Sequence, residues 1–93
     1  MKQNLDFGTA IKAMKNGSFI SREGWNGKGM YLLFHNGGSF IPMNEKLEDA
    51  CNKEGKENAY VEAYILMKNA QGTFSVWNPS IMDIFAEDWC ILD

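Results

Sequence analysis

The sequence is poor in the residue types that build metal and redox sites. It contains one histidine, His35, and two cysteines, Cys51 and Cys90, which do not form a C-x-x-C pair. A zinc or dithiol site needs several such ligands at close spacing. We therefore expect no metal site, no cofactor, and free thiols that are buried or idle.

Basic charge is also scarce. Lysine and arginine number 9 against 12 aspartates and glutamates, for a net charge of -3, so the chain has no broad positive field for duplex nucleic acid or an anionic membrane. No apolar run approaches the roughly 18 residues of a membrane span. The opening MKQNLDFGTA lacks the apolar stretch of a signal peptide. These absences predict no duplex nucleic acid partner, no membrane and a cytoplasmic protein.

The length of 93 residues predicts a single domain over residues 1–93. The chain shows no internal repeat, low-complexity tract or linker. A chain this short buries only a modest core, and self-association is a natural way to bury more apolar surface. We therefore expect a homo-oligomer.

The pattern predicts a helix that begins after Asp6 and ends at Gly17. Asp6 is suited to the N-cap, and Gly17 to the left-handed residue that closes a helix. Apolar residues recur between them at helical spacing: Phe7, Ala10, Ile11 and Met14. This stripe is expected to be buried.

Short runs of strand-forming residues predict an antiparallel sheet. Two strands are predicted on either side of a glycine-rich turn, over residues 18–21 and 30–35. A hairpin is predicted next, with residues 36–38 (Asn-Gly-Gly) as its turn and residues 39–43 as its second strand. Pro42 marks an edge strand or the end of pairing. A second hairpin joins residues 60–67 to 73–77 through the turn NAQG, and residues 89–92 form the last strand. The polar segment 44–58 is either a loop or a short exposed helix over residues 47–53.

A second, shorter helix is predicted near the C-terminus. Asn78 and Pro79 suit its cap and first turn, and Ile81, Ile84 and Phe85 would form its apolar side. The expected fold is therefore α+β, with an antiparallel sheet of short strands, one N-terminal helix and a short C-terminal helix.

The stretch SREGWNGKGMYLL, residues 21–33, is the first candidate binding segment. Its three glycines, at positions 24, 27 and 29, allow a tight turn whose N–H groups point outward, and Arg22 and Lys28 add charged donors suited to phosphate. The spacing matches neither a Walker loop nor a dinucleotide fingerprint. A plain β-turn with a solvated Lys28 and a core Trp25 is the alternative.

The stretch VWNPSIMDIFAEDW, residues 76–89, is the second candidate. Its aromatic and short polar side chains are Trp77, Asn78, Ser80, Asp83, Asp88 and Trp89. Indole faces stack on bases, and short polar side chains can hydrogen-bond to ribose hydroxyls or base edges. Trp89 is assigned to the core and Trp77 is left open, while the alternative for Asn78 and Ser80 is that they only cap the helix.

No catalytic residue is assigned. His35 lies at the end of an apolar strand, where a lone imidazole is usually structural. Glu87 and Asp88 are adjacent, so in an extended segment they point to opposite faces. Binding is therefore favoured over turnover.

Three blocks of this sequence resemble a known family. They are FGTAIKAMKNG from Phe7, REGWNGKGMYL from Arg22 and WNPSIMDIFAEDW from Trp77. Over residues 7–92, apart from the charged insert 45–58, the chain resembles a small phage and prophage domain family that includes the second type of Thoeris anti-defence protein.

The resemblance implies a sponge for nucleotide signals in the cytoplasm of the infected bacterial host. Members bind the cyclic ADP-ribose isomers that Thoeris sensors make from NAD and hold them without cleavage, and some also bind cyclic dinucleotides at separate pockets. The family forms homo-oligomers, tetramers, with pockets at subunit contacts. Two alternatives stay open: a hydrolase of the same signal and a protein-binding inhibitor module.

Matching motif positions, the resemblance implies a set of ligand-binding residues. The first block contributes Trp25, Asn26, Gly27, Lys28 and Met30, and the last block contributes Trp77, Ser80 and Asp83. Second choices are Phe7 and Arg22. The alternative for Arg22 is an ion pair with Glu23, Asp83 or Asp88, and the alternative for Phe7 is the buried stripe of its helix.

Overall fold

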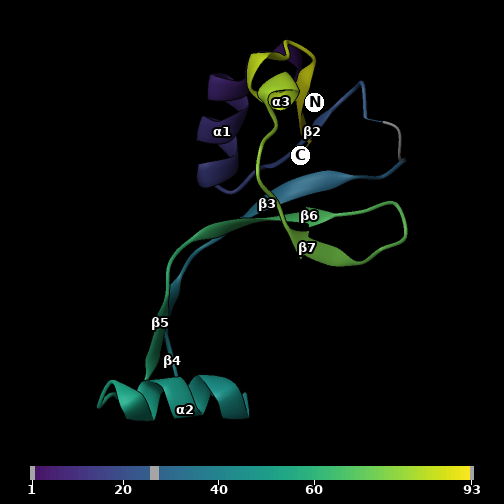
Figure 1. Ribbon diagram of the computed structural model, residues 1–93. Helices are drawn as coiled ribbons and strands as arrows, with labels where there is room; N and C mark the ends of the chain where they lie inside the picture. Colours follow the sequence, from purple (N-terminus) through teal and green to yellow (C-terminus); the bar gives the residue numbers. More distant parts are fainter. Residues whose placement is uncertain (1, 26–27, 93) are drawn as a thin grey trace.

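The computed structural model describes residues 2–25 and 28–92 and has the predicted α+β architecture (Figure 1). Its helices are α1 (Phe7–Lys15), α2 (Glu45–Lys53) and α3 (Ile81–Phe85). Its strands are β1 (Lys2–Leu5), β2 (Phe19–Arg22), β3 (Tyr31–His35), β4 (Gly38–Phe40), β5 (Ala59–Val61), β6 (Tyr64–Lys68), β7 (Phe74–Val76) and β8 (Trp89–Leu92). None of these helices is long and apolar enough to cross a membrane.

Six strands form one antiparallel sheet in the order β1-β8-β2-β3-β6-β7. The last strand, β8, therefore lies between the first two strands of the chain, with Ile20 opposite Ile91 and Leu5 opposite Trp89. Strand β1 was not predicted, because its sequence KQNL is polar and three of its four residues are exposed. Only its pairing with β8 makes this segment a strand.

The core lies between α1 and the strands β2, β3 and β8. Its fully buried large side chains are Met14, Ile20, Leu32 and Trp89. The predicted start and end of α1 are confirmed: Asp6 accepts a hydrogen bond from the Thr9 N–H at 2.8 Å, and Gly17 has a φ of +108°. The assignment of Trp89 to the core is also confirmed.

The predicted hairpin at residues 36–38 is wrong. Strand β3 pairs with β6 and not with β4, and β4 pairs with β5 in a separate two-stranded sheet. Neither Gly37 nor Gly38 has a positive φ. A Cβ on Gly37 would overlap the carbonyl oxygen of Val61, so this glycine permits close approach of two strands and does not form a turn.

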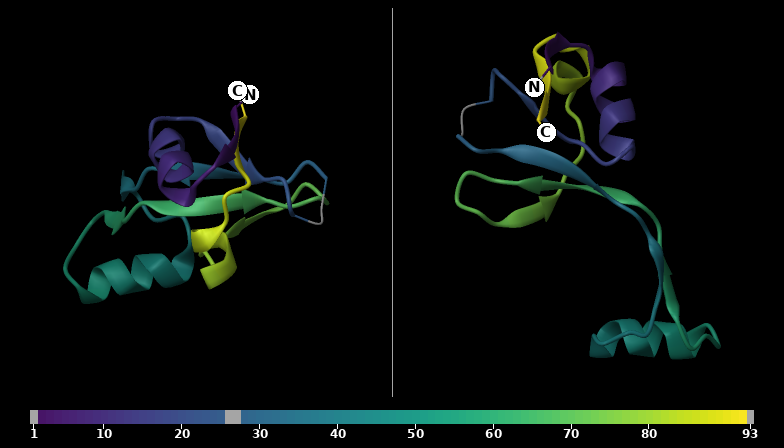
Figure 2. Two further views of the ribbon diagram at one scale, coloured as in Figure 1. Left: turned by 90° about the horizontal axis from the view of Figure 1, so that it is seen from above. Right: turned by 180° about the vertical axis from the view of Figure 1, so that it is seen from behind.

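The two-stranded sheet and α2 form an arm that projects from the rest of the domain (Figures 1 and 2). The radius of gyration is 16.2 Å, whereas a compact chain of this length would have about 12 Å.

Of the two predictions for residues 44–58, the helix is confirmed, with Asn44 as its N-cap. Cys51 is the buried residue of α2, and both Cys51 and Cys90 are buried free thiols, as expected.

The C-terminal half differs from its predictions in three details. The strand expected over residues 60–67 is two strands, β5 and β6, with Glu62 and Ala63 between them. The N-cap of α3 is Ser80 and not Asn78, so proline 79 precedes the helix. The apolar side expected for α3 is not buried, because the inward side chain of this helix is Asp83. The hairpin through residues 69–72 and the strand β8 are confirmed.

Candidate functional site

Three tryptophans from distant parts of the sequence pack against one another. The ring centroids of Trp25 and Trp77 lie 6.4 Å apart, and both rings pack edge-on against Trp89 at 5.5 and 6.2 Å. Trp89 is fully buried, and its Nε1–H donates to the backbone carbonyl of Asp83 at 2.9 Å. Trp25 and Trp77 are only half-buried. They therefore present indole surface to solvent from a rigid base.

Arg22 is held by two carboxylates beside this cluster. Its Nε donates to Asp88 Oδ1 at 2.8 Å, and its Nη1 donates to Asp83 Oδ1 at 2.9 Å. The alternative prediction for Arg22 was an ion pair with Glu23, Asp83 or Asp88. The structure shows ion pairs with Asp83 and Asp88 and none with Glu23. We call the set Arg22, Asp83 and Asp88 the arginine clamp.

The clamp lowers the pKa of both carboxyl groups. The hydrogen bond from Arg22 is the main reason that the pKa of Asp88 falls below its ordinary value. Burial opposes ionisation of Asp83, but hydrogen bonds from Ser80 and Arg22 outweigh burial, so its pKa is also lowered. The same contacts raise the already high pKa of Arg22. All three groups are therefore charged at neutral pH.

Ser80 and Asp83 form a capping box at the start of α3, in which each side chain bonds to the backbone N–H of the other. The Ser80 N–H and hydroxyl both donate to Asp83 Oδ2 at 2.9 Å, and the Asp83 N–H donates to Ser80 Oγ at 3.1 Å. With its other oxygen on Arg22, the Asp83 carboxylate is saturated by the protein itself. This geometry favours a positioning role for both residues over direct ligand contact.

The glycine-rich turn is attached to the clamp through Asp88. The backbone N–H groups of Glu23 and Gly24 donate to the carbonyl and to Oδ2 of Asp88, at 3.1 and 2.8 Å. A Cβ on Gly24 would lie 2.7 Å from that same Oδ2, so glycine is needed here to let the carboxylate approach. The clamp therefore fixes where the turn leaves β2.

The remaining predicted ligand-binding residues of the first segment lie farther along the glycine-rich turn. Lys28 is exposed and Met30 is half-buried, whereas Asn26 and Gly27 lie outside the described residues. Sequence reasoning missed Lys68, whose Nζ donates to the carbonyl of Gly29 at 3.0 Å. Lys68 reaches the turn because β6 pairs with β3, and that pairing was not predicted.

Phe7 lies in the first turn of α1 and packs against Trp89. Its ring centroid is 5.3 Å from that of Trp89, and the residue is half-buried against the core. This contact agrees with the alternative prediction for Phe7, that it belongs to the buried stripe of its helix.

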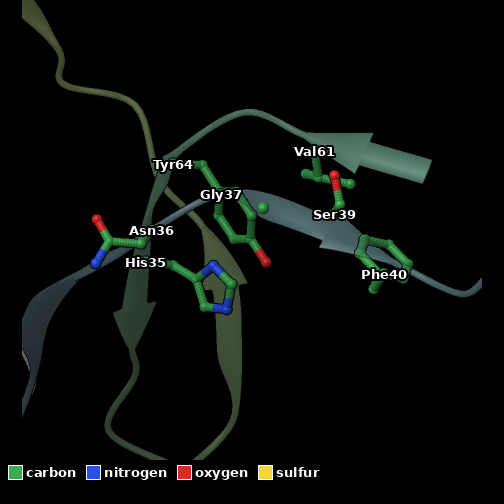
Figure 3. Close-up of a pocket in the computed structure, with 8 residues that line it drawn as sticks. His35, Asn36, Gly37, Ser39, Phe40, Val61 and Tyr64 are labelled. Carbon is green, nitrogen blue, oxygen red and sulfur yellow. The ribbon is translucent and has the colours of Figure 1, made fainter. Parts of the chain in front are cut away.

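Two hollows of the protomer lie away from the tryptophans. One, of about 230 Å³, is at the elbow where the arm leaves the main sheet, and the other, of about 360 Å³, lies beside α2. His35 lines the elbow hollow and stacks on Tyr64 with ring centroids 4.7 Å apart (Figure 3). Within residues 2–25 and 28–92, no group of three or more histidine, cysteine or acidic side chains could hold a metal ion.

Acid is expected to destabilise the fold by protonating the clamp. Because the pKa values of Asp83 and Asp88 are lower in the folded protein than their ordinary value of 3.8, the unfolded chain binds these protons first as the pH falls. The stabilisation is complete above that value and is lost as the pH falls through the folded-state pKa values.

The measurement is the midpoint of urea denaturation as a function of pH. We expect a nearly constant midpoint at about pH 5–7 and a decrease below about pH 4. Asp88→Asn should start from a lower midpoint and lose less of it in acid, because the variant lacks one of the depressed carboxyl groups. Equal acid sensitivity of the two proteins would contradict the role assigned to Asp88.

The chain matches a described family over nearly all of its length. Residues 5–92 match the family model described as the Thoeris anti-defense 2-like domain. The chain is also 32% identical over 95 residues to the protein Thoeris anti-defense 2 of Bacillus phage SP01, with 99% of each chain covered. The match therefore includes the tryptophan cluster, the clamp and the glycine-rich turn, and the chain belongs to the Thoeris anti-defense 2-like family.

Proposed function

We propose that this protein protects a phage from the Thoeris defence by capturing a cyclic ADP-ribose isomer and holding it intact. It would act in the cytoplasm of the infected host, where the signal is made. Family membership supports the anti-defence role. The finer proposal, capture of the nucleotide, depends on the chemistry of the site.

The observation that carries the proposal is the position of Trp25. This half-buried indole lies beside Trp77 and begins the segment that leads to the exposed Lys28. A cyclic ADP-ribose isomer contains an adenine, two riboses and a pyrophosphate, so it requires aromatic surface beside cationic and N–H donors. Stacking contributes about 1–3 kcal/mol per base, and a charged hydrogen bond to phosphate about 1.5–3 kcal/mol.

The arginine clamp supports this site without contacting the ligand. It joins the end of β2, the glycine-rich turn and the start of α3 through hydrogen bonds of 2.8–2.9 Å. Because Glu23 and Gly24 are already held by Asp88, the start of the turn loses less conformational entropy when a ligand binds. We therefore assign Arg22, Ser80 and Asp83 to positioning, and Trp25, Trp77 and Lys28 to contact with the nucleotide.

Self-association is part of the proposal. Binding below micromolar concentration requires about 8 kcal/mol or more, which favours an enclosed pocket. The tryptophans do not line either hollow of the protomer, and large apolar side chains are exposed on α3 and on the arm. A homo-oligomer, a tetramer, would cover this apolar surface and enclose ligand between subunits.

Capture can be tested with enzymatically made cyclic ADP-ribose isomers. The purified protein is mixed with the nucleotide, free ligand is removed by desalting, the complex is denatured by heat, and the supernatant is analysed by mass spectrometry. We expect one intact nucleotide, still able to activate the Thoeris effector. Lysozyme at equal concentration controls for carry-over.

Each other result opposes the proposal in its own way. A nucleotide of changed mass would identify a hydrolase. No nucleotide in the supernatant would leave a protein-binding inhibitor as the function that fits the exposed apolar residues.

A further inference from the structure

The glycine-rich turn between β2 and β3 is held at both of its ends. At its start, Asp88 accepts hydrogen bonds from the backbone N–H groups of Glu23 and Gly24. At its end, the Lys68 ammonium donates to the carbonyl of Gly29 at 3.0 Å. Asp88 directly precedes β8 and Lys68 ends β6, so two different strands of the main sheet fix the two ends of the turn.

The Lys68 side chain is directed to this carbonyl by aromatic rings on the neighbouring strands. Lys68 lies opposite Tyr31 in the pairing of β6 with β3 (Figure 1). Its Nζ is 5.5 Å from the centroid of the Tyr31 ring, a distance at which the face of the ring attracts a cation. The Tyr31 ring in turn packs on the Phe19 ring of β2, with centroids 4.9 Å apart. The row of Phe19, Tyr31 and Lys68 therefore crosses three adjacent strands and ends at the turn.

Lys68 balances no carboxylate in the described part of the chain. Arg22 forms both of the ion pairs found there, whereas the Lys68 ammonium donates to the Gly29 carbonyl. Lys68 is also half-buried. A half-buried lysine that is bonded to one backbone carbonyl acts on the local backbone geometry, and not on the charge balance of the sheet.

The carbonyl that Lys68 holds belongs to a glycine in the left-handed region. Gly29 has a φ of +73°, and glycine loses more conformational freedom on ordering than any other residue. The residue directly before it is Lys28, the exposed cation that we assign to the nucleotide. The hydrogen bond from Lys68 therefore restricts the backbone that carries Lys28.

Lys68 itself lies away from the two half-buried tryptophans. Its neighbour Met67 packs against the core, as do Trp25 and Trp77. Because successive side chains of a strand point to opposite faces of the sheet, Lys68 lies on the face opposite the core. Any effect of Lys68 on a nucleotide that stacks on Trp25 and Trp77 must therefore pass through the turn.

We propose that Lys68 is a positioning residue of the nucleotide site. It orders the Gly29 end of the turn and thereby places the Lys28 ammonium for its contact with a phosphate. The clamp, through Asp88, does the same for the start of the turn. This inference rests on the proposed function and adds to it a residue that acts without touching the ligand.

The affinity for the cyclic ADP-ribose isomer, measured by isothermal titration, tests this role. Lys68→Met keeps an unbranched side chain but removes the donor, and it should weaken binding about 3- to 10-fold, the cost of ordering one or two more side chains on binding. Lys68→Arg restores a cationic donor and should recover most of the affinity. Lys2→Met, which replaces an exposed lysine of β1, is the matched control and should bind as the wild type does.

A double-mutant cycle distinguishes positioning from direct contact. If Lys68 acts through Lys28, Lys68→Met should change the affinity by less than about 2-fold in a protein that already carries Lys28→Ala. Two effects that multiply would instead indicate that Lys68 contacts the nucleotide independently, and would overturn the positioning role.

Hydrogen exchange of the ligand-free protein tests the same contact without a nucleotide. Release of the Gly29 carbonyl in Lys68→Met should make the amides of residues 28–31 exchange faster, because the local opening of the turn becomes easier. The midpoint of urea denaturation should stay close to that of the wild type. Unchanged exchange in these residues would show that Lys68 does not order the turn.

The results separate this inference from the proposed function. A wild-type protein that captures the nucleotide and is unaffected by Lys68→Met would overturn the role of Lys68 alone. A wild-type protein that captures no nucleotide would overturn the proposed function and, with it, the role of Lys68 in binding, whatever the exchange rates of the turn.

Discussion

Replacement of Arg22 by alanine is expected to lower the free energy of unfolding by about 3 kcal/mol at neutral pH. The variant leaves Asp83, whose side chain is 12% exposed, without its cationic partner, and it also removes the ion pair to Asp88. The expected loss lies at the low end for a broken buried ion pair, because the Asp88 side chain is 29% exposed and partly hydrated. Urea denaturation followed by tryptophan fluorescence measures it.

Two controls make this result specific. Lys15→Ala removes an exposed cation from α1 and should change the stability by less than about 0.5 kcal/mol. Arg22→Lys keeps the charge, but a single ammonium group lacks the planar fork that reaches both carboxylates, so it should recover only part of the loss. An Arg22→Ala protein as stable as the wild type would show that the clamp does not hold the fold together.

Replacement of Lys28 by alanine is expected to weaken nucleotide capture about 10- to 100-fold while leaving stability nearly unchanged. The side chain is exposed, so its loss removes little packing, whereas a charged hydrogen bond to phosphate contributes about 1.5–3 kcal/mol. Isothermal titration with the cyclic ADP-ribose isomer measures the change in affinity, and urea denaturation checks the fold.

The comparison that decides this prediction is with Lys56→Ala. Lys56 is an equally exposed cation on the arm, and its loss should leave the affinity unchanged. Increasing salt should weaken the wild type more than Lys28→Ala, because the ionic contact is screened. Equal affinities of the Lys28 and Lys56 variants would exclude Lys28 from the site, and Trp25 and Trp77 would then have to bind the nucleotide without it.

Much of the site could be predicted because its residues fall in two short blocks with distinctive composition. The segments around Trp25 and Trp77 were both chosen from sequence, and the structure brings them within contact of each other. The sequence could not show which residues of these segments contact a ligand and which only position the site. Whether Arg22 and Asp83 face a ligand or one another depends on the pairing of β2 with β8, which joins residues more than 60 positions apart, such as Arg22 and Trp89.

By itself the sequence determined the local elements: α1 with its cap and closing glycine, the β6–β7 hairpin, the final strand and the family. The local elements depend on side-chain periodicity and turn preferences within a few residues, and the family depends on the resemblance of three sequence blocks. Only the tertiary structure decided that residues 36–38 continue into the arm, that polar β1 is a strand, and that α3 turns its apolar side outward. The physical reason is the same in each case, because hydrogen bonds and ion pairs between distant segments outweigh weak local preferences.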